Sequence, residues 1–103
     1  MKTYALIIDK RALDDIQTAV SHYSELYGNL VEKFLNQLAV SLDRIKQNPF
    51  YQLKYGNIRS LRIKKFPYSI HYSINETFDE INILAVVHTA SDPDKIWMWR
   101  EDE

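Results

Sequence analysis

The sequence predicts a single α+β domain, residues 1–103, in which a hairpin of two helices packs on one face of a small, mainly antiparallel sheet. Two observations lead to this fold class. Apolar residues recur at helical spacing through two consecutive segments near the N-terminus, and they alternate with polar residues in the middle of the chain. The predicted order of elements is β-α-α-β-β-β. Because one helical hairpin covers only one face of a sheet, we expect the opposite face to be open.

A short strand and a helix are predicted first. Residues 3–8 (T-Y-A-L-I-I) are rich in side chains that favour strands, and Asp9 is a suitable N-cap for a helix after them. The helix should end near Gly28–Asn29, since both residues tolerate a left-handed backbone. Its apolar stripe follows alternating steps of three and four residues and consists of Leu13, Ile16, Val20, Tyr23 and Tyr27.

The second helix should begin at Leu30 or Val31 and stop at Asn48–Pro49. Its apolar stripe comprises Phe34, Leu38, Leu42 and Ile45, with Leu35 and Ala39 widening it. Two helices joined by so short a turn must lie antiparallel, so the two stripes should form one shared core face.

The rest of the sheet is predicted from residues 58–87. After a loop over residues 50–57, period-2 alternation continues on both sides of Phe66–Pro67, which is typical of two strands joined at that point. Residues 80–87 (E-I-N-I-L-A-V-V) are apolar on both sides, so this strand should be central and should end at His88.

Composition excludes several classes of chemistry. The chain has no cysteine, which excludes a disulfide framework, a thiol nucleophile and a thiolate zinc site, and which fits a reducing compartment. No apolar run approaches the length of a membrane span, and no leader opens the chain. The histidines and carboxylates have no zinc-like spacing. We therefore expect a cytoplasmic protein that needs no metal or other cofactor and contacts no membrane.

Positive charge is concentrated in one segment, although the formal net charge is only −1. Residues 44–75 contain no Asp or Glu, and strand alternation predicts that Arg62, Lys64 and His71 share the open face while Arg59 and Lys65 lie on the other. Such groups can stabilise a phosphodiester transition state, with histidine as acid or base, or bind phosphate and carboxylate groups without any reaction. The basic residues of this segment are Arg44, Lys46, Lys54, Arg59, Arg62, Lys64 and Lys65.

The C-terminal segment carries two tryptophans, Trp97 and Trp99, separated by one residue. They either close the apolar edge of the sheet as part of the core, which we favour, or form an exposed aromatic site for a partner.

Four motifs in sequence order resemble the RelE/ParE superfamily, the toxins of bacterial type II toxin–antitoxin pairs. They are D-D-I-x-x-A-V-x-H-Y from Asp14, E-K-F-L-x-x-L from Glu32, I-R-S-L-R-I-K-K-F-P-Y-S-I-H-Y from Ile58, and I-L-A-V-V-H-T-x-x-D-P from Ile83 with a tryptophan after it. The resemblance implies the fold predicted above and a cognate antitoxin that blocks the toxin, with operator DNA contacted only through that antitoxin. ParE-like members inhibit DNA gyrase by binding it, whereas RelE-like members cleave mRNA on the ribosome.

The resemblance also matches particular residues to the family, namely Arg59, Arg62, Lys64 and Lys65 in the basic hairpin and His88 after the last core strand. We expect phosphate or target binding by Arg59, Arg62, Lys64, Lys65 and, from its position on the polar face, His71. We expect antitoxin binding at the tryptophans Trp97 and Trp99. In the endonuclease alternative the catalytic residues are Arg59, Arg62, Lys64 and His88. Many relatives have arginines where this chain has Ala90 and Ser91, and ribosome-targeting relatives tend to be strongly basic. These departures favour ParE-like inhibition of a protein target over mRNA cleavage. A third reading is an eroded site that retains only antitoxin binding and operator regulation.

Overall fold

The computed structural model describes residues 3–26 and 28–89. Tyr27 of the predicted stripe and the predicted antitoxin-binding residues Trp97 and Trp99 lie outside this part of the chain. Its elements in order are β1 (Ala5–Ile8), α1 (Lys10–Ser24), α2 (Leu30–Gln47), β2 (Leu53–Tyr55), β3 (Ile58–Arg62), β4 (Tyr68–Asn75) and β5 (Glu80–His88).

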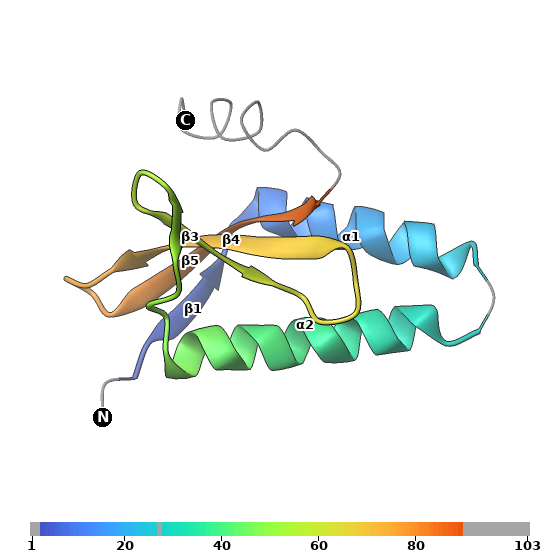
Figure 1. The fold of residues 1–103 in the computed structure, drawn as a ribbon, viewed down its shortest axis with the longest axis horizontal. Helices are drawn as coiled ribbons and strands as arrows, with labels where there is room; N and C mark the ends of the chain where they lie inside the picture. The colour runs from blue at the N-terminus through green and yellow to red at the C-terminus, as the bar shows by residue number, and fades with distance from the viewer. Residues whose placement is uncertain (1–2, 27, 90–103) are drawn as a thin grey trace.

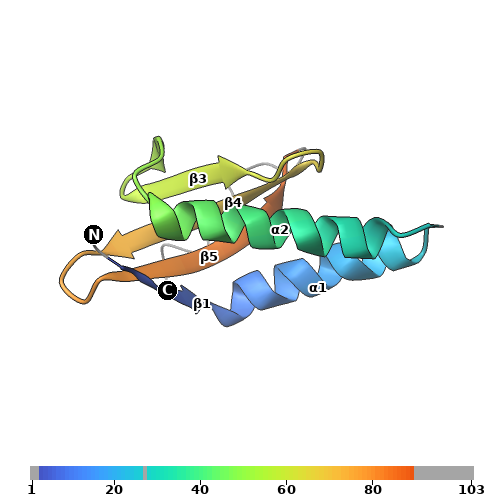
Figure 2. The same cartoon turned by 90° about the horizontal axis from the view of Figure 1, so that it is seen from below.

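The two helices lie on one face of a five-stranded sheet, as Figures 1 and 2 show from two directions. The strand order is β1-β5-β4-β3-β2, with β1 parallel to β5 and the other neighbours antiparallel. The predicted α+β class and the helical hairpin on a mainly antiparallel sheet are therefore confirmed. The sheet has one strand more than predicted, because β2 lies within residues 50–57, which were expected to form only a loop.

Helix α1 begins where the sequence predicts. The Asp9 side chain accepts a hydrogen bond from the Arg11 backbone N–H at 2.9 Å, which makes it the N-cap. The helix ends at Ser24, before the predicted stop at Gly28–Asn29. Its buried side chains are Ala12, Ala19 and Tyr23. The prediction that Leu13 belongs to the core-facing stripe is wrong, since this side chain is 46% exposed. The small side chains of Ala12 and Ala19 face the core instead.

Helix α2 buries Phe34, Leu38, Ser41 and Ile45 at steps of four, three and four residues. It ends at Gln47, directly before the predicted Asn48–Pro49 stop. Leu35 and Ala39 do not widen the core face as predicted, since both are exposed, Leu35 by 42%. Among the described residues, neither helix is long and apolar enough to cross a membrane.

A β-bulge in β5 decides which side chains of that strand face the helices. His71 pairs with Ala85, whereas the next residue of β4, Tyr72, pairs with Ile83, so Leu84 is an extra residue on β5. Strict alternation would send Ile83 and Val86 to opposite faces. With the extra residue, both belong to the core beneath the helices, while Ala85 faces the other way beside His71.

Helix α1 is attached to the sheet at this bulge. The Asp15 carboxylate accepts a hydrogen bond from the Val86 backbone N–H at 3.0 Å. The neighbouring strand β1 ends before Val86, because its last pair with β5 joins Ile8 to Ile83. A side chain of the helix therefore satisfies a backbone donor that the β1 edge does not reach.

The core is aromatic at the end nearest the helix–helix connection. Here four rings from α1, α2, the β3–β4 turn and β4 contact one another with centroids 5.3 to 6.2 Å apart. We call these residues, Tyr23, Phe34, Phe66 and Tyr68, the aromatic cluster. Most of the contacts are edge-to-face or tilted, which is the favourable geometry for ring quadrupoles.

Candidate functional site

The predicted basic residues are distributed over different parts of the fold. Pairing between β3 and β4 places Arg59 opposite the core residue Tyr72, and Arg62 opposite Ser69. Cross-strand partners share a face, so Arg59 lies on the helix-covered face, as predicted, and Arg62 lies on the other. The two arginines cannot reach one ligand from the same side of the sheet.

Arg59 is held in place by the segment that follows α2. Its guanidinium donates a hydrogen bond to the Tyr51 carbonyl oxygen at 2.6 Å, and its central carbon lies 5.3 Å from the centroid of the Phe50 ring. The second contact is a cation–π interaction. No described carboxylate forms an ion pair with Arg59. The side chain is thus oriented while retaining guanidinium N–H groups for an external acceptor.

Lys64 and Lys65 lie in the β3–β4 turn, because β3 ends at Arg62. The prediction that they alternate on strand faces is therefore wrong. Both are exposed, and Lys65 has a φ of 72°, which is the left-handed backbone of a tight turn. Together with Arg62 they place positive charge at the surface.

His71 was expected to be exposed on the open face, and this expectation is wrong. The side chain is only 3% exposed. It lies in the middle of the sheet, between Ser60 of β3 and Ala85 of β5, so strands flank it on both sides. A buried imidazole is not positioned to contact a macromolecular phosphate.

His88 ends β5 as predicted, and it is exposed. Its ring meets the Tyr68 ring edge-on, with centroids 5.1 Å apart. The next residue, Thr89, donates its backbone N–H to the Pro67 carbonyl oxygen at 2.8 Å, which joins the end of β5 to the β3–β4 turn. Burial raises the pKa of the Tyr68 hydroxyl, so it is neutral at physiological pH. His88 and the two turn lysines are therefore at the same end of the sheet.

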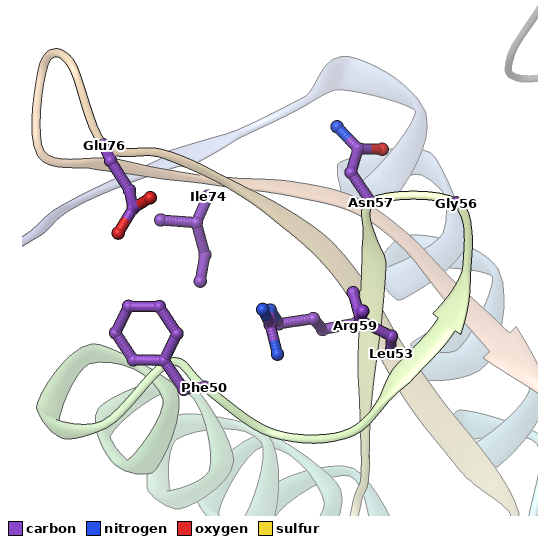
Figure 3. Close-up of a pocket in the computed structure, with 7 residues that line it drawn as sticks. All are labelled: Phe50, Leu53, Gly56, Asn57, Arg59, Ile74 and Glu76. Atoms are coloured by element: carbon purple, nitrogen blue, oxygen red, sulfur yellow. The ribbon is translucent and has the colours of Figure 1, made fainter.

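The structure also contains a depression that the sequence analysis missed. It lies beyond the C-terminal end of α2, next to the edge strand β2, and has a volume of about 310 Å³. We call it the β2-edge depression. Figure 3 shows the Phe50 ring, Ile74 and the Arg59 guanidinium around a shared space, with Glu76 at one rim. The lining residues are Phe50, Leu53, Gly56, Asn57, Arg59, Ile74 and Glu76.

One wall of this depression is anchored from the core. The Tyr72 hydroxyl donates a hydrogen bond to the Pro49 carbonyl oxygen at 2.7 Å, and this contact is buried. Burial raises the pKa of Tyr72 to about 12, so the hydroxyl keeps its proton and remains a donor. Tyr72 and Arg59 thus fix the backbone at Pro49 and Tyr51, on either side of Phe50. No local sequence pattern predicts these two contacts, which join residues 23 and 8 positions apart.

The fold is the one found in solved structures of RelE and ParDE toxin–antitoxin systems. A chain of the chromosomal ParDE toxin–antitoxin system of P. aeruginosa superposes with a TM-score of 0.73 at 18% identity, covering 85% of this chain and 98% of that one. A free E. coli RelE variant, with two arginines replaced by alanine, gives a TM-score of 0.65 at 14% identity, covering 97% and 96%. The toxin–antitoxin complex RelBE2 from Mycobacterium tuberculosis gives 0.56 at 16% identity, covering 84% and 98%.

The family follows from the sequence match. The family model described as the ParE toxin of the type II toxin–antitoxin system parDE matches residues 6–93, which is most of the chain. No curated protein sequence matches significantly. The chain belongs to the ParE toxin family and is the toxin of a type II toxin–antitoxin system.

Proposed function

We propose that this toxin arrests bacterial growth by ParE-like binding to a protein target such as DNA gyrase, and that a cognate antitoxin neutralises it. The observation that carries the proposal is the separation of the cationic groups. Arg59 and Arg62 lie on opposite faces of the sheet, and His71 is buried. A nuclease needs several charged or titratable groups within hydrogen-bond reach of one phosphate. A surface that only binds another protein has no such requirement.

The comparisons support the same reading. The matching family model is that of the ParE toxin, and the ParDE toxin gives a higher TM-score than the RelE variant. The solved complexes of RelE-type toxins with their antitoxins, including that of E. coli, support a cognate antitoxin as the partner of this chain.

An mRNA endonuclease is the second candidate, and one observation favours it. The hydrogen bond from Thr89 to Pro67 keeps His88 at the same end of the sheet as the turn that carries Lys64 and Lys65. In this mechanism the lysines bind the phosphate and His88 transfers the proton, with Arg62 adding charge from the end of β3.

Three measurements on the chain without its antitoxin separate the candidates. We expect growth arrest, loss of supercoiling by purified gyrase mixed with the purified chain, and no new 5′ ends within the codons of an abundant mRNA. New 5′ ends at fixed codon positions that disappear in His88→Ala would contradict ParE-like inhibition and support the endonuclease. Absence of growth arrest would favour an eroded site.

A further inference from the structure

The β2-edge depression combines exposed apolar surface with one oriented cation. Phe50 and Leu53 are 51% and 52% exposed, which is high for large apolar side chains. Ile74 of β4 completes the apolar lining. Helix α2 ends at Gln47, so this part of the sheet extends beyond the helical layer. The result is an apolar concavity with a guanidinium at its wall.

The orientation of Arg59 selects the chemistry of a ligand. The Phe50 ring and the Tyr51 carbonyl fix the guanidinium, so little conformational entropy is lost when it binds an acceptor. A planar guanidinium binds a carboxylate through two parallel hydrogen bonds. The apolar lining requires an apolar group next to that carboxylate.

Charge at the wall of the depression favours the same ligand. The lining contains one basic side chain, Arg59, and one acidic side chain, Glu76. An acidic segment is therefore attracted to Arg59 over a distance of about one Debye length, roughly 10 Å. Glu76, which is exposed at the rim, opposes the same segment.

We propose that the β2-edge depression binds a segment of the antitoxin in which an Asp or Glu adjoins a large apolar residue. The carboxylate pairs with Arg59, and the apolar side chain fills the space between Phe50, Leu53 and Ile74. This inference rests on the proposed function for the existence of the antitoxin. It assigns a neutralisation contact to residues other than Trp97 and Trp99, which the sequence analysis predicted to bind the antitoxin.

The test measures the affinity of the full chain for the small protein encoded by the adjacent reading frame, by isothermal titration calorimetry. Arg59→Gln should weaken binding about tenfold or more, because charge-assisted hydrogen bonds are lost. Leu53→Asn should weaken it about fivefold through loss of apolar contact. Glu76→Gln should tighten it about two- to fivefold, and less at high salt, because a repulsive charge is removed.

Matched controls separate the site from general effects. Arg44→Gln removes a charge from the same basic segment, and Leu26→Asn changes a leucine that is 45% exposed at the other end of the molecule; both should stay within about twofold. Glu76→Gln also serves as a control for misfolding, because a variant with a damaged fold would not bind the antitoxin more tightly. Equal affinity of the wild type, Leu53→Asn and Glu76→Gln would overturn the site and leave the proposed function intact. Absence of any binding by the wild type would overturn both.

Discussion

The two ends of the helix-covered face differ in how completely they are filled. At one end the aromatic cluster packs Tyr23 and Phe34 of the helices against Phe66 and Tyr68, and none of the four side chains is more than 8% exposed. At the other end α2 has stopped, and Phe50 is 51% exposed beside Arg59. Both ends carry aromatic side chains on the helix-covered side of the sheet. The difference is whether a helix lies over them.

The comparison shows that helix length decides where apolar surface remains available. Asn48–Pro49 ends α2, and the chain then turns towards β2 instead of covering the last residues of β4. The closed end contributes stability, and we assign the open end to partner recognition. Three substitutions test that division, and their expected effects on the free energy of unfolding decrease in order.

Phe34→Ala should have the largest effect. The side chain is fully buried within the aromatic cluster, so truncation should cost about 3–5 kcal/mol, measured by urea unfolding. The matched substitution at the open end, Phe50→Ala, should cost less than about 1 kcal/mol, because half of that ring is already exposed. Similar losses for the two phenylalanines would remove the distinction between the ends.

Asp15→Ala should have an intermediate effect. It leaves the Val86 backbone N–H at the β5 bulge without the carboxylate, which should cost about 1–3 kcal/mol. The amide of Val86 should also exchange its hydrogen faster. Asp14→Ala is the control, since Asp14 is exposed on the same helix, and it should change stability by about 0.5 kcal/mol or less. Slow exchange at Val86 in Asp15→Ala would contradict this attachment of α1 to the sheet.

Tyr72→Phe should have the smallest effect, about 1 kcal/mol, because it removes one buried hydrogen bond, to Pro49. The folded pKa, about 12, lies above the ordinary value of 10.0, so the contribution of the hydroxyl is complete below pH 10 and is lost as the pH rises towards 12. Unfolding measured between these pH values should show a steeper loss of stability for the wild type than for Tyr72→Phe. Parallel pH profiles for the wild type and Tyr72→Phe would show that the Tyr72 hydroxyl does not cause the loss of stability at high pH.

Much of the fold follows from local patterns. The Asp9 N-cap, the end of α2 before Asn48–Pro49 and the hairpin around Phe66–Pro67 are set by residues close in the chain, and the structure confirms them. Strand β2 was missed, since three exposed residues in a loop carry no periodicity and exist as a strand only through pairing with β3. Strand alternation correctly predicted that Arg59 and Arg62 lie on opposite faces. The burial of His71 and the position of Lys64 and Lys65 in a turn were not predicted, because both depend on where β3 ends and how it pairs with β4.

The sequence by itself determined the fold class, the family and the segment that carries the positive charge. These properties depend on the spacing of apolar residues and on motifs within short stretches. Tertiary structure decided the rest. The extra residue at Leu84 turned both Ile83 and Val86 towards the helices, and strand pairing buried His71. The contacts of Tyr72 and Arg59 with the segment after α2 formed a depression that no local pattern encodes, because each contact joins residues from separate elements.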